Sequence, residues 1–278
     1  MKHIFLASLV VAPLLSTAQE LPQPSPLGKV EQVIGLTTVS IEYSRPSAKG
    51  RVIFGDLVPK GKVWRTGANQ CTLFKTDGPV LVEGQKLPAG AYALFTIPND
   101  DKWVIIFNSD TSLWGEEDRK DSADVLRVKV PQQKCEMTET FTIGFEGVKD
   151  DHARLDLRWE TTRASIDLYA DATDQGFRNI ETALADPKAT FGGYNGAARF
   201  CLDRNVKLTK ALEWAQKSTS MERKYWNTHT LARALAANGR YKEAITAAEE
   251  SMKLAQEAKA EAYVKMNKEK IEEWATKK

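Results

Sequence analysis

The spacing of apolar residues changes once along this chain, near Asp171, and this change limits the folds that the chain can adopt. Upstream, short segments alternate apolar and polar residues, and the clusters of Gly, Pro, Asp and Asn between them carry no helical pattern. This predicts an antiparallel β-sandwich or barrel over residues 22–170. Downstream, helical spacing predicts an α-helical domain over residues 171–278, so the expected class is α+β with two domains. The clearest strand segments are 38–43, 103–107, 126–130, 141–145 and 155–159.

The helical half contains two predicted helix pairs. One pair turns near Asn205 and the other at Asn238-Gly239-Arg240, where Gly239 can supply left-handed backbone. Ala211 and Ala244 stand 33 positions apart, close to the period of about 34 in tetratricopeptide repeats, which this half resembles. The Trp, the second-helix Phe and the terminal Pro of that pattern are replaced. A bundle of helical hairpins without such repeats therefore stays an alternative.

A last helix is predicted over residues 258–276, with one face rich in Lys and Glu. Helices of about a dozen residues are marginal alone in water, so these helices must pack on each other. Such a stack leaves a concave face for a segment of a protein or peptide, which we expect to be the partner of this half.

Five motifs stand in a fixed order in the strand half. They are YSRP at 43–46, KGRVIFG at 49–55, VWRTGAN at 63–69, LPAGAY at 87–92, and 103–108 followed by Trp114-Gly115. Together they resemble the domain of unknown function 2911 (DUF2911) family over nearly all of residues 22–168. The resemblance implies an exported bacterial β-domain, typical of Bacteroidetes and often followed by helical repeats. The family has no established activity, so the resemblance supplies no catalytic residue.

The first residues predict a signal peptide over 1–18. Lys2 and His3 precede an apolar run of about a dozen residues, and Ser16-Thr17-Ala18 supplies small residues for cleavage. A transmembrane anchor needs about 20 apolar residues, so no membrane span is expected here or elsewhere. We expect a periplasmic or secreted protein.

The charge balance is close to neutral. Removing Lys2 with residues 1–18 leaves 38 basic and 37 acidic residues, a net charge of +1. Residues 19–170 carry 19 basic and 22 acidic side chains, whereas 171–278 carry 19 and 15, so the halves differ in sign, −3 against +4. The difference between the halves supports a domain boundary. The small net charge provides no positive electrostatic field that would attract nucleic acid, so no nucleic-acid partner is expected.

Three cysteines cannot all pair within one chain. Cys71 and Cys135 lie in the same half, and a bridge between them would add about 4 kcal/mol by loop entropy. Buried free thiols are the alternative, and the sequence does not decide between them. Cys201 is expected in the helical core.

The segment GKVWRTGANQCTLF, residues 61–74, raises the question of a ligand site. Arg45, Arg51, Trp64, Arg65 and Asn69 are the candidate ligand-binding residues, because guanidinium forks and an indole face suit an anionic or sugar-like small ligand. The alternative is structural: Trp64 closes the end of the sandwich while Arg65 and Arg51 pair with Asp56 or Glu83.

Catalytic and metal motifs give no match. The mature chain keeps two histidines, and no CxxC pair, HExxH, GxSxG or phosphate-binding loop is present. The acidic segment 116–121 with Asp124 lacks the spacing and central Gly of a calcium loop. We therefore expect no cofactor, no metal and no assigned catalytic residue. The favoured hypothesis is a non-catalytic binding protein of the bacterial cell envelope, and the alternative is an extracytoplasmic hydrolase acting on carbohydrate or peptide.

Overall fold

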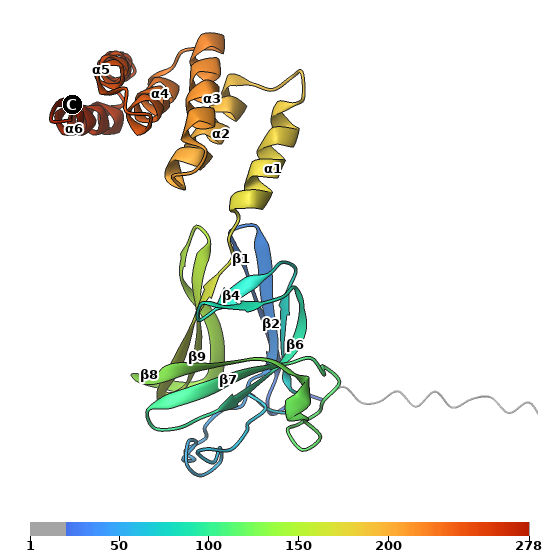
Figure 1. Cartoon of the computed structure of the whole chain (residues 1–278). Helices are drawn as coiled ribbons and strands as arrows, with labels where there is room; N and C mark the ends of the chain where they lie inside the picture. Colours follow the sequence, from blue (N-terminus) through green and yellow to red (C-terminus); the bar gives the residue numbers. More distant parts are fainter. Residues whose placement is uncertain (1–20, 278) are drawn as a thin grey trace, which may run out of the picture. The chain divides into compact units, whose positions relative to one another are not determined.

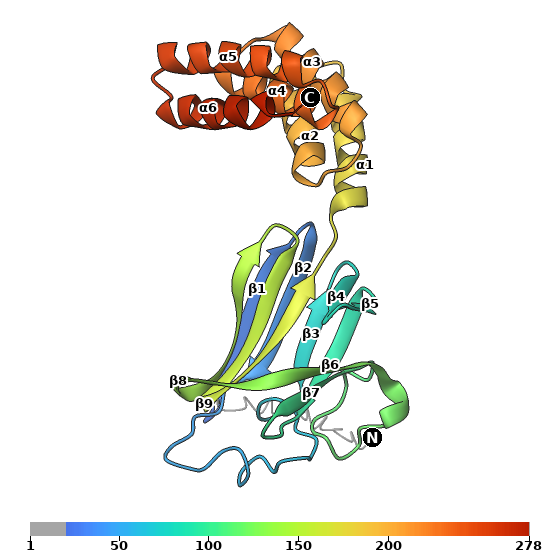
Figure 2. The same ribbon diagram turned by 60° about the vertical axis from the view of Figure 1, so that its left-hand side comes forward.

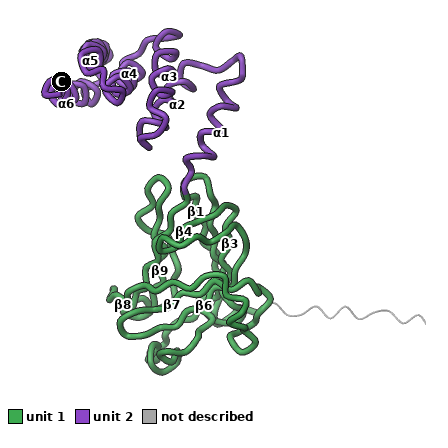
Figure 3. The backbone as a smooth tube through the Cα atoms, in the orientation of Figure 1, with its two compact units in different colours: residues 1–170 green, residues 171–278 purple. Residues whose placement is uncertain are grey.

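The computed structural model describes residues 21–277, and the predicted signal peptide lies outside them. The chain separates into two compact units, one ending at Ala170 and the other beginning at Asp171 (Figure 3). The first unit is all strand apart from one short 3-10 turn, and the second is all helix. The predicted α+β class is therefore confirmed.

Nine strands form one antiparallel sheet within the part of the chain that is described, in the order β1-β2-β3-β6-β7-β8-β9-β4-β5 (Figure 1). Neighbours in sequence are mostly neighbours in the sheet, as hairpin connections favour. The strands are β1 (Leu27–Ile34), β2 (Thr37–Ser44), β3 (Thr72–Thr76), β4 (Val80–Val82), β5 (Gln85–Leu87), β6 (Gly90–Ile97), β7 (Lys102–Asn108), β8 (Asp124–Lys149) and β9 (His152–Tyr169).

The two longest strands bend the sheet around its core. β8 pairs with β7 up to Pro131 and then with β9, and the pairing shifts register between Lys134 and Thr142. Segments 126–130 and 141–145, expected as separate strands, therefore lie on one bent strand. β9 also bends: Glu160 has a positive φ of 49°, and the amide of Ala170 donates to the carbonyl of Asp151 at 2.8 Å. Both ends of β9 thus lie together (Figure 2).

One apolar core fills the inside of this curved sheet. It takes residues from strands along the whole sheet order, including Ile41, Phe74, Ile105, Phe141 and Leu157, each 0 or 1% exposed. A smaller cluster around Cys71, Phe95, Ile106 and Leu113 lies on the opposite face of β6 and β7. The 109–123 segment, which contributes Leu113, therefore covers the outer face of the sheet.

The second unit contains six helices among the described residues (Figure 1). Turns at Asn205 and Gly239, with φ of 53° and 75°, separate α2 from α3 and α4 from α5, as predicted. At the start of the first helix, the Asp171 carboxylate accepts from the Thr173 amide at 2.8 Å. The helices are α1 (Thr173–Leu184), α2 (Phe191–Asp203), α3 (Leu208–Met221), α4 (Tyr225–Ala237), α5 (Tyr241–Glu257) and α6 (Glu261–Ala275).

Successive hairpins make the same polar contact. The Ser218 hydroxyl of α3 donates to the Phe191 carbonyl at 2.7 Å, and the Ser251 hydroxyl of α5 donates to the Tyr225 carbonyl at 2.7 Å. The two serines are 33 positions apart and the two carbonyls 34. Each serine also accepts from an asparagine amide of the helix that follows its own. The hairpins therefore repeat in structure and not only in alanine spacing.

We predict that Ser218→Ala and Ser251→Ala each lower the free energy of unfolding by about 1–3 kcal/mol, because each leaves a buried asparagine amide and a carbonyl short of a partner. Urea titration followed by far-ultraviolet circular dichroism measures this. Thr246→Ala is the matched control, since the hydroxyl of Thr246 bonds only its own helix at an exposed position. Equal effects of Thr246→Ala and Ser251→Ala would contradict the prediction.

Candidate functional site

Trp64 is part of the core of the β unit. Its side chain is 8% exposed, and its backbone pairs with Thr96 on β6. The indole Nε1 donates to the Gly67 carbonyl at 3.1 Å, and the ring stacks on Trp159 with centroids 5.8 Å apart and planes at 18°. Phe141 lies 5.1 Å away in an edge contact. Both faces of the indole therefore meet protein and do not form an open stacking surface.

Gly67 allows the loop after Trp64 to pass close to β2. Its φ is 158°, and a Cβ at this position would lie 3.0 Å from the carbonyl oxygen of Ser44. Asn69, with φ of 57°, donates through its side-chain amide to the Ser44 hydroxyl at 3.2 Å. The loop is thus fixed against β2 by backbone approach and one amide contact.

Arg65 pairs with carboxylates from a distant segment. Its Nε lies 3.0 Å from Glu116 and its guanidinium 3.7 Å from Glu117, while the Asn69 carbonyl accepts from it at 3.2 Å. A Cβ at Gly115 would overlap the Glu117 carboxylate and lie 3.1 Å from the guanidinium carbon of Arg65, so a larger residue there would shift these side chains. The structural alternative in the sequence analysis expected Arg65 to pair with Asp56 or Glu83. In the structure, Arg65 pairs with Glu116 and Glu117 instead.

Arg45 and Arg51 each donate a hydrogen bond to a backbone carbonyl. The Arg45 guanidinium donates to the carbonyl of Phe141 at 3.3 Å and to the hydroxyl of Thr142 at 3.1 Å, both on β8. Arg51 donates to the Ala48 carbonyl at 2.9 Å in its own loop. Of the five candidates, Arg65 and Asn69 are joined by a hydrogen bond, and none of the five lines either cavity described below.

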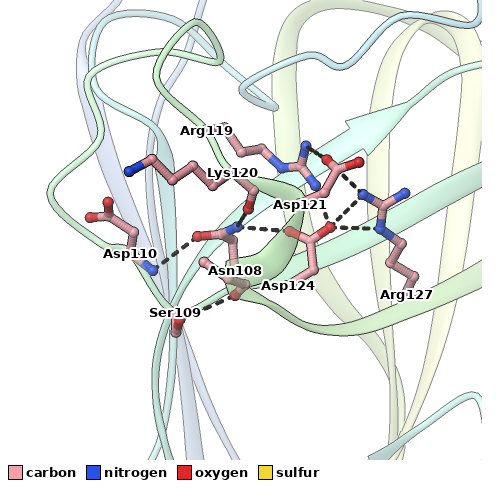
Figure 4. A network of polar contacts seen from close by, with 9 residues as sticks. Asn108, Ser109, Asp110, Arg119, Lys120, Asp121, Asp124 and Arg127 are labelled. Carbon is pink, nitrogen blue, oxygen red and sulfur yellow. Dashed lines mark hydrogen bonds and ion pairs between the residues drawn. The ribbon is translucent and has the colours of Figure 1, made fainter.

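A buried ion pair joins the 109–123 segment to the start of β8 (Figure 4). Arg119 and Asp124 pair with side chains only 4% and 5% exposed, and the Asn108 amide donates to Asp124 at 2.7 Å. Arg127 also bonds Asp124, at 2.6 Å, and the hydrogen bond from Arg119 lowers the pKa of Asp121. Between residues 21 and 277, no cluster of three or more His, Cys, Asp or Glu side chains could hold a metal ion. The acidic segment instead binds arginine and anchors the loop.

A cavity of about 500 Å³ lies where the ends of β9 meet. The His152 and Tyr169 rings contact each other there with centroids 4.6 Å apart, and Arg154, held at 2.8 Å by the buried Asp156, lies on its wall. Sequence reasoning missed this cavity, because His152 and Tyr169 come together only when β9 bends.

The three cysteines are free thiols. Cys71 is buried beside Phe95, whereas the Cys135 sulfur lies on β8 and faces the Glu160 carbonyl at 3.9 Å. Burial raises the pKa of Cys71 and of Cys135, which disfavours the reactive thiolate form.

A second cavity, of about 320 Å³, is lined by residues of α2, α4, α5 and α6 of the helical unit. Leu202, Ala236 and Trp274 supply apolar walls, and three cations and one carboxylate supply the polar ones. We call this the helical groove. Its charged residues are Arg233, Lys270, Glu273 and Lys277.

Glu273 is shared between two of the groove lysines. Lys270 donates to it at 2.7 Å and Lys277 at 2.8 Å, and these hydrogen bonds lower its pKa to about 2. Arg233 bonds Asp203 at 2.6 Å. The groove thus keeps an excess of positive charge at neutral pH.

One helical turn before Arg233 on α4, His229 is buried. Its Nδ1 lies 2.7 Å from the Asn267 carbonyl oxygen on α6, and the Asn267 amide nitrogen donates to Ser251 and to the Tyr263 carbonyl. His229 therefore carries its proton on Nδ1 and donates. Burial lowers the pKa of His229 and the bond to Asn267 partly opposes this. Arg233, Lys270 and Arg199 lower this pKa further.

Comparison with known proteins identifies the strand unit. The model of the family described as "Protein of unknown function (DUF2911)" matches residues 25–168, more than half of the chain. The chain therefore belongs to the DUF2911 family, as the five motifs indicated. No curated protein and no solved structure matches it. No helix within residues 21–277 has the length and apolar character needed to cross a membrane.

We predict that Arg65→Ala destabilises the β unit by about 1–3 kcal/mol, because it leaves Glu116 and the Asn69 carbonyl without a charged donor. Thermal unfolding followed by tryptophan fluorescence checks this. Arg51→Ala, which removes contacts only within its own exposed loop, is the control and is expected to change stability by less than about 0.5 kcal/mol. An unchanged melting temperature for Arg65→Ala would favour a ligand role for this side chain.

The depressed pKa of His229 predicts loss of helical stability in mild acid. Below its ordinary value of 6.5, the unfolded chain binds a proton that the folded chain does not. Stability therefore falls as pH drops from about 6.5 toward the folded pKa, by at most about 1.4 kcal/mol per pH unit. Urea unfolding at about pH 7.5 and about pH 5.5, followed by circular dichroism, should show a smaller difference in His229→Gln than in the wild type. His152→Gln, an exposed position on β9, is the control. The same pH dependence in His229→Gln as in the wild type would be the contrary result.

Proposed function

We propose that this chain is an exported, non-catalytic binding protein of the bacterial cell envelope, and that its helical unit holds a segment of another protein. The observation that carries the proposal is the helical groove. Most of its lining comes from α4 and α6, with Leu202 of α2 and Tyr241 of α5, and it combines apolar walls with charged side chains. Such a surface suits an extended or helical segment, which buries apolar side chains while its polar groups find partners.

The repeated hairpin contacts support a tetratricopeptide-like arrangement. Ser218 and Ser251 make equivalent bonds, and Ala211 and Ala244, both 0% exposed, occupy equivalent buried positions. In stacks of this kind the first helix of each pair lines one face, so that α2, α4 and α6 together form a continuous inner surface. The serine–asparagine bonds hold that surface rigid, which reduces the entropy lost on binding.

For the β unit we propose a docking role for a small ligand or a surface. The cavity between His152, Arg154 and Tyr169 favours this location over the Trp64 loop, because the indole of Trp64 and the guanidinium of Arg65 are already bonded within the protein. The candidate set of Arg45, Arg51, Trp64, Arg65 and Asn69 stays a prediction, as does hydrolysis of carbohydrate or peptide.

Site-specific photocrosslinking tests the main proposal. A photoreactive amino acid at Ala237, an exposed residue of the groove wall, is expected to give one discrete adduct in cells that produce the full-length chain. The control carries the same group at Lys253, exposed on α5 and outside the groove. Adducts of equal yield from both positions, or none from Ala237, would count against a groove partner.

A further inference from the structure

The cavity where the ends of β9 meet has an aromatic part and a charged part. The aromatic part consists of His152 and Tyr169, whose ring centroids lie 4.6 Å apart, and Leu81 of β4 pairs with Tyr169 and extends this wall. Arg154 and Asp167 supply the charged part. The volume of about 500 Å³ lies in the range of pockets that bind small molecules.

Arg154 is held in place by a buried carboxylate. Asp156 is only 1% exposed, and it accepts from the Nε of Arg154 at 2.8 Å and from its Nη2 at 3.5 Å. Arg163 approaches the same carboxylate at 3.7 Å. The Nη1 group of Arg154 donates to no residue between 21 and 277, and its side chain is 40% exposed. Asp156 therefore orients a guanidinium that still has N–H groups for a ligand.

Asp167 is fixed through its backbone. Its amide donates to the Glu83 carboxylate at 2.7 Å, and its carbonyl accepts from the Glu83 amide at 3.0 Å. The residue is exposed, and its carboxylate forms no hydrogen bond or ion pair with the rest of the described chain. The cavity thus offers an acceptor whose backbone position is set before a ligand binds, which reduces the entropy lost on binding.

The charges around the cavity favour a neutral ligand. Hydrogen bonding to Asp156 raises the pKa of Arg154, and the negative charges of Glu146 and Asp167 raise it further. An anion that approached Arg154 would therefore meet these carboxylates, whereas a cation would meet the guanidinium. A neutral ligand that has both donors and acceptors can use the two kinds of group together.

Glycines leave the cavity accessible. Gly84 and Gly147 both line it, with φ of 75° and 58°, and a Cβ at either position would meet no atom within 4 Å. Neighbouring side chains therefore do not fill the space in front of these two residues. A ring-shaped ligand can enter there and reach the aromatic wall.

We infer that this cavity binds one pyranose ring of a neutral sugar. This inference rests on the docking role proposed for the β unit and adds the chemistry of the ligand. A pyranose has an apolar face of C–H groups, which packs against the rings of His152 and Tyr169. Each of its hydroxyls can both donate and accept, so Asp167 accepts from one hydroxyl and the Nη1 of Arg154 donates to another.

Saturation-transfer NMR titrations of the full-length chain test the inference. The probes are glucose, galactose and mannose, and each is compared with its uronate, which differs only by a carboxylate at C6. We expect at least one of the neutral sugars to bind. It should bind about two- to fivefold more tightly than its uronate, because the uronate adds a negative charge beside Asp167 and Glu146.

Substitutions in the cavity wall then locate the binding. His152→Ala and Asp167→Ala should each weaken binding of the neutral sugar about two- to tenfold, since they remove a packing surface and an acceptor. Both residues are exposed, so both variants should keep the wild-type melting temperature, which circular dichroism verifies. Asp118→Ala, an exposed carboxylate of the 109–123 segment that does not line the cavity, is the matched control and should leave binding unchanged.

The outcomes separate this inference from the proposed function. No saturation transfer to any of the neutral sugars, or equal effects of Asp118→Ala and Asp167→Ala, would overturn the sugar inference. Tighter binding of the uronates would overturn it as well, but the β unit would keep its docking role for a ligand of other chemistry. The Ala237 crosslink reports on the helical unit alone, so its failure would overturn the main proposal and leave the sugar inference standing.

Discussion

Close approach between helices is the constraint on which the helical unit depends. Alanines that are 0% exposed stand at the contacts, among them Ala198, Ala211, Ala232 and Ala244. A larger side chain at any of these would move the backbones apart, because buried positions are packed to near crystalline density. With the helices this close, Ser251 of α5 can reach the Tyr225 carbonyl of α4, the other helix of the same hairpin. The inner surface, including its charged residues, is therefore set by small residues that contribute no chemistry of their own.

In the β unit, the arginines Arg45, Arg51 and Arg65 form hydrogen bonds and ion pairs with other groups of the protein. Trp64 joins an aromatic cluster with Trp103, Trp159 and Phe141, and the loop that follows it must be fixed if the indole is to stay buried. Arg65 provides this by bonding Glu116. Loops without regular structure leave carbonyls unpaired, and guanidinium groups can satisfy them. A segment rich in Arg, Trp and Gly is therefore as consistent with a loop held by internal hydrogen bonds as with a ligand site.

The sequence was informative where local signals determine structure and uninformative where distant segments meet. The change near Asp171 and the turns at Asn205 and Gly239 follow from periodicity and backbone preference, and the structure has both turns. The bend of β9 at Glu160 has no such signal, so the cavity beside His152 could not be found. Arg65 and Glu116 are 51 positions apart, and many carboxylates compete as partners at that separation. The charges of the groove come from α4 and from the C-terminal end of α6, and no local signal in the sequence indicated that they meet.

Hydrogen–deuterium exchange of the full-length chain, with and without the partner identified by crosslinking from Ala237, tests most directly whether the helical unit is the recognition surface. The bound partner should slow exchange in α2, α4 and α6, whose inner surface it would cover, and leave the 63–71 loop of the β unit unchanged. Slower exchange in that loop, with the three helices unaffected, would contradict the account and return the site to the segment around Trp64.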